Sequence, residues 1–433
     1  MATALVVGNM VGSGVFLLPA ALGAYGGVSL FGWLFTTAGA LVLALTFARL
    51  ARAHPRAGGP YAYTRAAFGD FPAFLVAWSY WISTCAGNAA IAVALVGYLA
   101  FFAPALATSP LLGAAAALLS IWFLTWVNTR GVREAGGVQL VTTLLKLAPL
   151  VAIGTLGLVH LHGANFVPFN TSGRSTLGAV SSTAALTLWA FLGLESATIP
   201  AGAVARADRT IPRATLLGTG IAAAVYILST GAVMGVLPPH LLAASTAPFA
   251  DAARTMWGPW AATAVAAGAA VSCFGALNGW TLLLGQMPLA AAGDGLLPRA
   301  VGRLSARGTP TGALVFSSAL VTAIVASNYT KGLVVEFTFI ILLATISTLV
   351  AYLFSTAAFV TTFFRGAARP RGWRHAAAPA AAILAFAYTV WAIVGSGRDA
   401  VFWGFLLLLA GVPAYYWAAR RAARAGATGT GPA

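Results

Sequence analysis

The sequence predicts an all-α membrane protein with twelve transmembrane helices. Three observations support this fold class: a shortage of charged residues, a series of long apolar segments, and an alternation of arginine between the gaps that separate them. Of the 433 residues, 60% are hydrophobic and only 7% are charged, whereas about a quarter of a soluble domain is charged. So few charges cannot cover a water-facing surface, so we expect lipid to be the main solvent.

The apolar segments have the length that a membrane crossing requires, about 20 residues. They lie at roughly 2–24, 28–50, 71–103, 110–128, 137–160, 180–204, 213–236, 258–291, 312–328, 334–363, 377–395 and 400–419. No charged stretch or cleavage site of a signal peptide accompanies the first segment. This segment is short on its N-terminal side, so we expect either a clipped half-helix or a start further upstream.

Basic residues gather in every second gap. Nineteen arginines follow the second, fourth, sixth, eighth and tenth segments or lie in the tail, whereas the other gaps hold Arg174, Arg254, Lys331 and Arg398. The positive-inside rule then places both termini in the cytoplasm. It also explains the net charge of +16 without a nucleic acid partner. We expect residues 420–433 to form a disordered cytoplasmic tail.

Residues that carry enzyme or metal chemistry do not cluster in this sequence. Cys85 and Cys273 lie inside apolar segments, and the five histidines lack the spacing of metal ligands. No pairing of a nucleophile with a base is visible. We therefore expect no disulfide framework, no metal, no cofactor and no enzymatic activity.

The first segment contains three glycines within residues 8–14, GNMVGSG. Glycine destabilises a helix interior, and irregular backbone inside a membrane is tolerated where it lines a cavity or is buried in protein. An unwound point frees N–H groups, which suit a carboxylate, and C=O groups, which suit an ammonium. The pattern therefore indicates a broken helix that binds an amino acid or amine.

The sixth segment carries a similar interruption at Gly193, within residues 189–196, WAFLGLES. Gly12 stands seven residues before Pro19, and Gly193 stands seven before Pro200. Matched interruptions in two halves of a chain indicate a transporter site built from repeats. The alternative is that these glycines serve only close helix packing.

Two ionisable residues lie deep within predicted spans, Glu195 and Lys146. A charge there costs about 3 kcal/mol on insertion scales and points to function. Glu195 could carry a proton or attract a cationic substrate; alternatively, it bonds unwound backbone. Lys146 could replace a sodium ion at unwound carbonyls or carry a proton; alternatively, it extends toward the cytoplasmic interface.

Aromatic residues at mid-membrane depth are further candidates, because tryptophan usually lies at the interfaces. Tyr80, Trp189, Trp280 and Tyr352 fall within predicted spans. An aromatic face can stack on a substrate cation. For each residue alone, core packing or contact with lipid explains the position equally well.

The whole pattern resembles the amino acid–polyamine–organocation superfamily, and within it the basic amino acid/polyamine antiporters, including arginine/agmatine exchangers. The likeness rests on residues 8–16, 58–63, 188–197, 279–283 and 394–397. It implies one transporter domain over residues 1–419. Five helices (about 1–160) and an inverted repeat of five (about 180–363) would be followed by two more (about 377–419). The first and sixth helices would be discontinuous. Members of this family often form homodimers, so the resemblance also implies a possible homodimer.

The resemblance also implies roles for individual residues. Ser13 and Gly14 would bind the substrate carboxylate, and backbone around Asn9, Met10, Trp189 and Leu192 would hold the α-ammonium. Trp280 would stack on the substrate side chain, while Asn88 and backbone near Cys85 would meet its distal end. Tyr80, Glu195 and Tyr352 would form an inner gate linked to protonation.

Two positions depart from the exchangers in this likeness. Ala344 stands where an arginine exchanger has a serine near the guanidinium, which weakens the case for arginine. Lys146 instead resembles a lysine of proton-coupled amino acid transporters, which leaves exchange, proton symport or both open.

We therefore expect a multi-pass transporter of the bacterial inner membrane that exchanges a basic amino acid for its decarboxylated amine by alternating access. Arginine/agmatine leads, followed by lysine/cadaverine and ornithine/putrescine. The alternatives are a proton-coupled permease for neutral or broad-range amino acids and a non-transporting amino acid sensor.

Overall fold

In the computed structural model, the backbone is described for residues 1–433 except 246, 298–300, 329–332, 366–372 and 428–433. Every regular element within the described residues is a helix, and no strand occurs among them. Nine helices of this described part are long and apolar enough to cross a membrane, and three shorter apolar helices span Ala2–Phe16, Thr311–Ala326 and Pro379–Gly395. The predicted class, an all-α membrane protein, is confirmed, whereas the number twelve stays a prediction.

The helices follow the apolar segments closely. In the first half they are α1 (Ala2–Met10), α2 (Ser13–Gly23), α3 (Ser29–Ala53), α4 (Pro60–Phe68), α5 (Asp70–Leu99), α6 (Ala105–Thr108), α7 (Pro110–Arg130) and α8 (Val132–Leu156). In the second half they are α9 (Thr176–Leu188), α10 (Ala207–Val236), α11 (Pro239–Ala244), α12 (Pro248–Trp257), α13 (Pro259–Gly293), α14 (Thr311–Asn328), α15 (Leu333–Arg365), α16 (Trp373–Gly395) and α17 (Arg398–Ala427).

Two segments differ from the sequence-based expectation. The sixth segment is interrupted, as expected, but the interruption is longer than a break at Gly193: α9 ends at Leu188, and only short 3-10 turns follow, at Trp189–Phe191, Ser196–Thr198 and Ala201–Ala203. The tail expected to be disordered from residue 420 continues α17 as far as Ala427. Alanine and arginine, which fill that stretch, are strong helix formers. Residues 428–433 lie outside the described residues.

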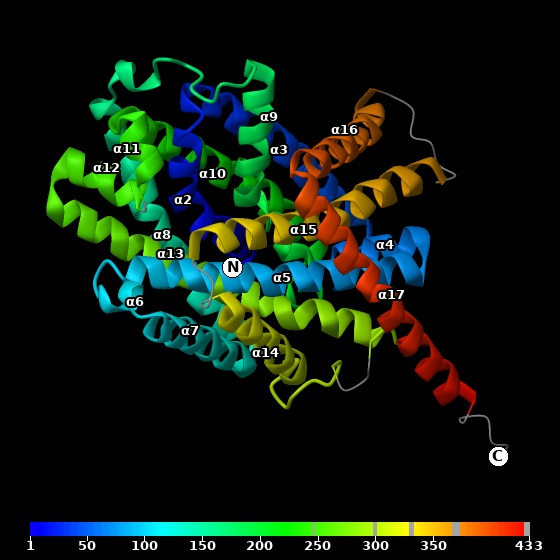
Figure 1. Ribbon diagram of the computed structural model, residues 1–433. Coiled ribbons are helices and arrows are strands. Elements are labelled where there is room, and N and C mark those ends of the chain that lie inside the picture. Colours follow the sequence, from blue (N-terminus) through cyan, green and yellow to red (C-terminus); the bar gives the residue numbers. More distant parts are fainter. Residues whose placement is uncertain (246, 298–300, 329–332, 366–372, 428–433) are drawn as a thin grey trace.

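The broken first helix lies inside the protein. α1 packs against α8, α10 and α13, and two long pairings, α3 with α10 and α5 with α13, join the first predicted repeat to the second. Figure 1 shows α1 and α2 among these helices, while α16 and α17 lie at one edge. Val6, Val7, Met10 and Val11 are buried. The irregular backbone between α1 and α2 is therefore shielded by protein, as unwound segments in membranes must be.

Candidate functional site

The first helix is interrupted at residues 11–12, between α1 and α2. A Cβ added to Gly12 would lie 2.9 Å from Ala276 Cβ, and one added to Gly14 would lie 2.7 Å from Trp189 Cδ1. Both glycines have a negative φ, because neither is among the positive-φ glycines of the described chain. Glycine is therefore required here by the close approach of neighbouring side chains and not by an unusual dihedral angle. The helix break and the close packing of glycine, which the sequence offered as alternatives, both occur at this place.

The sixth helix is interrupted by a different device. Gly193 has a φ of 104°, a conformation that strongly favours glycine. A Cβ added there would also lie 3.1 Å from Asn9 Cβ and 3.2 Å from Trp280 Cζ2. The two predicted breaks therefore face each other across Asn9, which brings residues far apart in the sequence to one place.

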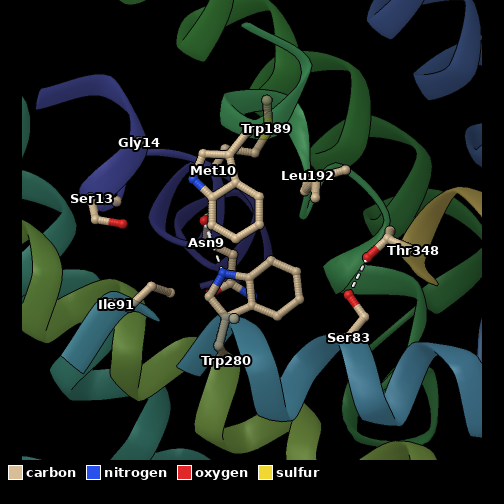
Figure 2. Close-up of a pocket in the computed structure, with 12 residues that line it drawn as sticks. Asn9, Met10, Ser13, Gly14, Ser83, Ile91, Trp189, Leu192, Trp280 and Thr348 are labelled. Carbon is tan, nitrogen blue, oxygen red and sulfur yellow. Dashed lines mark hydrogen bonds between the residues drawn. The ribbon is translucent and has the colours of Figure 1, made fainter. Parts of the chain in front are cut away.

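A small pocket, with a cavity volume of about 30 Å³, lies at these two breaks. Figure 2 shows the indoles of Trp189 and Trp280 in its middle, with Ser13 and Gly14 on one side and Ser83 and Thr348 on the other. None of the lining residues is acidic or basic. They are Asn9, Met10, Gly12, Ser13, Gly14, Ser83, Gly87, Ile91, Trp189, Leu192, Trp280 and Thr348.

Within the described part of the chain, some polar side-chain atoms of the pocket lining are buried without a hydrogen-bond partner. The hydroxyl of Ser13 is one, and both polar atoms of the Asn9 side chain are others. Ser13 is also the first residue of α2, where backbone N–H groups lack helical partners. Buried polar atoms normally find partners, so this side of the pocket is built to receive a polar ligand.

The carbonyl groups at the end of α1 are all engaged. The Gly8 carbonyl accepts from Lys146 Nζ at 2.5 Å, and the Asn9 carbonyl accepts from Trp280 Nε1 at 3.1 Å. The Met10 carbonyl accepts from the Gly12 N–H at 3.0 Å, and the Val11 carbonyl accepts from the Ser272 hydroxyl at 3.2 Å. A substrate ammonium at Met10 would therefore use the second lone pair of this carbonyl.

Lys146 is fully buried on α8. Its ammonium does not extend to the interface but bonds the Gly8 carbonyl in the last turn of α1. Among the described residues, no acid forms an ion pair with it. The lysine therefore supplies the only cation at the break in the described structure, which is the position predicted for an ammonium or sodium ion.

The three predicted gate residues meet one another. Both oxygens of the fully buried Glu195 carboxylate accept hydrogen bonds, Oε1 from the Tyr80 hydroxyl at 2.5 Å and Oε2 from the Tyr352 hydroxyl. The cluster joins the break after α9 to α5 and α15. Its role as a gate stays a prediction, but this arrangement holds a buried carboxylate with its charge shared by two donors.

The three other predicted substrate residues, Cys85, Asn88 and Ala344, are buried but do not line the pocket. The Asn88 amide donates to the Thr84 carbonyl at 2.7 Å, and its oxygen accepts from the Thr281 hydroxyl at 3.2 Å. Protein partners thus engage both ends of this amide. Contact between these three residues and substrate stays a prediction.

Sequence analysis missed the hydroxyl residues Ser83 and Thr348, which do line the pocket. Ser83 lies three residues after Tyr80 on α5, and Thr348 lies four before Tyr352 on α15. Residues three or four apart share a helix face, so this spacing could have found them. Many other hydroxyl residues lie at such spacings, and only the packing of α5 on α15 singles out these two.

A polar cluster also joins α4, α5 and α13. Arg65 contacts Asp70 at 2.7 Å and Asp294 at 2.5 Å, and the Tyr61 hydroxyl donates to Asp294 at 2.7 Å. Burial, followed by the hydrogen bond and charge of Asp294, raises the pKa of Tyr61 above its ordinary range. The hydrogen bond of Asp70 raises the pKa of Arg65. The cluster therefore links α4 to the start of α5 and the end of α13. Close to α4, the Gly58 N–H donates to the carbonyl of Ile199, which follows the second break, at 2.9 Å.

Metal-binding groups are not evident in this part of the protein. Within the described residues, no three His, Cys, Asp or Glu side chains gather to hold a metal ion.

Comparison with known proteins agrees with this geometry. The model of the amino acid permease family matches residues 1–415. The cadaverine/lysine antiporter of Escherichia coli (strain K12) is 38% identical over 326 residues, which cover 74% of this chain and 72% of the relative. The putrescine transporters PotE of Haemophilus influenzae and Escherichia coli (strain K12) are each 30% identical, over 95% of this chain and 94% of each relative. The chain therefore belongs to the amino acid permease family and, within it, to the basic amino acid/polyamine antiporters.

Proposed function

We propose that this protein is a secondary active antiporter that exchanges a basic amino acid for its decarboxylated amine by alternating access. The observation that carries the proposal is the uncharged pocket between two broken helices. One side offers the unpartnered Ser13 hydroxyl and the N-terminus of α2, which suit a carboxylate. The middle offers the faces of Trp189 and Trp280, which suit a cation.

Among the substrate pairs, lysine/cadaverine and ornithine/putrescine now come before arginine/agmatine. The sequence ranked arginine first by resemblance, although Ala344 lacks the serine hydroxyl of arginine exchangers. The similar proteins carry the names cadaverine/lysine antiporter and putrescine transporter.

We also propose that the protein lies in a bacterial inner membrane with both termini in the cytoplasm. The alternation of arginine between gaps supports this orientation. A homodimer stays a prediction from family resemblance. Cysteine labelling in intact cells tests the orientation, with one cysteine added before Ala2 and another added in the loop before Thr176. A thiol reagent that cannot cross the membrane should label only the cysteine in the loop.

Counterflow in proteoliposomes tests the transport proposal. Vesicles that contain the purified chain are loaded with unlabelled lysine, and uptake of labelled lysine, cadaverine, arginine, agmatine and alanine is followed. We expect rapid uptake of lysine and cadaverine that requires internal substrate. Uptake of alanine alone would overturn the proposal, and binding without any transport would instead support the sensor.

A second candidate function, a proton-coupled amino acid permease, is favoured by one contact, that of Lys146 with the Gly8 carbonyl. A buried amine at the helix break could exchange a proton as the transporter changes conformation. Net uptake into vesicles without internal substrate, driven by an imposed pH gradient, would support this candidate. Uptake that needs counter-substrate at every gradient would support the antiporter.

A further inference from the structure

The side of the pocket opposite Ser13 and Gly14 is formed by a pair of hydroxyl groups. Ser83 on α5 and Thr348 on α15 both line the pocket and are almost fully buried. Their oxygens lie 2.6 Å apart, and Figure 2 shows this pair beyond the two indoles from the α2 end. A substrate with its carboxylate at Ser13 would therefore direct its distal end toward this pair.

The hydrogen bonds of the pair have one consistent direction. The Ala344 carbonyl can only accept, so Ser83 donates its single proton to it across 2.6 Å. The proton in the contact between the two hydroxyls must then come from Thr348. Both protons are used within the protein, and the lone pairs that remain can only accept. This side of the pocket is therefore a surface of acceptors, suited to a group that only donates.

Charge around the pair also bears on its ligand. No lining residue is acidic, and both oxygens of Glu195 already accept hydrogen bonds from Tyr80 and Tyr352. A cation at the pair would thus be held by neutral oxygens and not by a carboxylate. Conduction and transport require that a bound ion can leave again, and neutral oxygens allow this more readily than an ion pair does.

The number of acceptors distinguishes two kinds of cation. An ammonium has three donors on a compact tetrahedral centre, whereas a guanidinium has five in a planar fork. Ser83 keeps one free lone pair and Thr348 keeps two, so the pair offers three acceptor positions to a ligand. The methyl group of Ala344 adds no further acceptor. A guanidinium here would leave donors unpaired, which is costly in a buried site.

We propose that Ser83 and Thr348 form the subsite for the distal ammonium of the substrate and select alkyl ammonium over guanidinium. This proposal rests on the proposed function, because it takes the substrate to be a basic amino acid or its amine. It assigns the selection to hydroxyl side chains that meet on two helices, and it makes lysine, ornithine and their amines the fitting substrates.

Equilibrium binding to the purified full chain tests the proposal separately from transport. Ser83→Ala and Thr348→Val each remove one hydroxyl, and Thr348→Ser keeps it. Lysine is compared with norleucine, which has the same carbon chain without the distal ammonium, and with arginine. We expect each hydroxyl deletion to weaken lysine binding by about 10-fold or more, the size of a lost hydrogen bond to a charged group. Norleucine binding should change by less than about 2-fold, and Thr348→Ser should retain lysine binding.

The matched control is Thr356→Val, on the same helix. The Thr356 hydroxyl is buried and bonds only carbonyls of its own helix, those of Tyr352 and Leu353. This variant should bind all three ligands as the parent does. Equal losses for lysine and norleucine, or an unchanged ratio of lysine to arginine affinity, would overturn the subsite. The proposed exchange fails separately, if the parent binds lysine but shows no counterflow.

Discussion

The ammonium of Lys146 donates a hydrogen bond of 2.5 Å to the carbonyl of Gly8, so a cation from α8 holds the end of the first half-helix. The contact lies three to four residues before the break at residues 11–12. Negative helix C-termini attract cations, which explains why a buried lysine is tolerated here. A change in the protonation of this amine would therefore act directly on the backbone that borders the substrate pocket.

Replacement of Lys146 by methionine should remove the dependence of transport on pH while leaving the fold intact. Methionine has a similar length and no charge, so it fills the same space without a donor for Gly8. We expect the ratio of uptake at about pH 6 to uptake at about pH 8 to move toward one, because the amine that bonds the Gly8 carbonyl is gone. Counterflow and gradient-driven uptake across pH measure this ratio. A variant that keeps the parent's pH profile would show that Lys146 does not couple protons, and Lys146→Arg, which keeps the charge, serves as control.

Replacement of Tyr352 by phenylalanine should weaken the closed state of the gate that Tyr80, Glu195 and Tyr352 are predicted to form. The change leaves one buried carboxylate oxygen without its donor, at a cost of about 1–3 kcal/mol. We expect a lower melting temperature and faster modification of a cysteine placed next to the cluster. Tyr98→Phe is the matched control, because the buried Tyr98 hydroxyl finds no hydrogen-bond partner among the described residues. Equal behaviour of both variants would contradict a closing role for the cluster.

Replacement of Trp280 by leucine should weaken the binding of cationic substrates. The change removes an aromatic face and the donor to the Asn9 carbonyl. A cation–π contact contributes roughly 0.5–2 kcal/mol, so lysine and cadaverine affinity should fall by about 2- to 30-fold. Titration calorimetry with the purified protein measures this loss. Trp260→Leu, an exposed tryptophan in the first turn of the same helix, should bind like the parent; an unchanged affinity for Trp280→Leu would exclude stacking.

Replacement of Gly12 by alanine should destabilise the break. The added Cβ would lie 2.9 Å from Ala276 Cβ, and neither methyl group can rotate away. Overpacking of this kind costs about 1–3 kcal/mol and should lower both the melting temperature and lysine binding. Gly220→Ala, within α10, meets no atom within 4 Å and should be neutral or slightly stabilising. If Gly12→Ala melts and binds like Gly220→Ala, the close approach at the break is not required.

Replacement of Tyr61 by phenylalanine should destabilise the protein equally at about pH 6 and about pH 9. The pKa of Tyr61 is raised in the folded state, by burial first and Asp294 second. Its contribution is therefore fully present below the ordinary tyrosine pKa of about 10 and is lost only as the pH rises through the raised value. Thermal melts of the parent and the variant at both pH values test this. A difference between the two proteins that disappears by about pH 9 would contradict the sign of the shift.

Composition and local pattern suffice to predict the lipid environment, the all-α class and the two breaks. Few charges and long apolar segments require lipid, and the segments at 110–128 and 312–328 agree closely with α7 and α14. Gly12 and Gly193 mark the interruptions because local backbone and side-chain size suffice to disfavour a helix there. Apolar length did not predict the end of α9 at Leu188, because the residues that follow are apolar too, although they form short 3-10 turns.

Which polar residues meet at the pocket depends on how the helices pack. Asn88 and Ser83 lie five residues apart on one helix. The Asn88 amide is bonded to Thr84 and Thr281, whereas Ser83 lines the pocket together with Thr348. The direction of a side chain depends on how α5 is rotated against α13 and α15, and residues hundreds of positions away fix that rotation. The partner of Lys146 also depends on the fold. The sequence predicts a charge inside the membrane, but only the packing of α8 against α1 brings the Gly8 carbonyl within hydrogen-bonding distance of it.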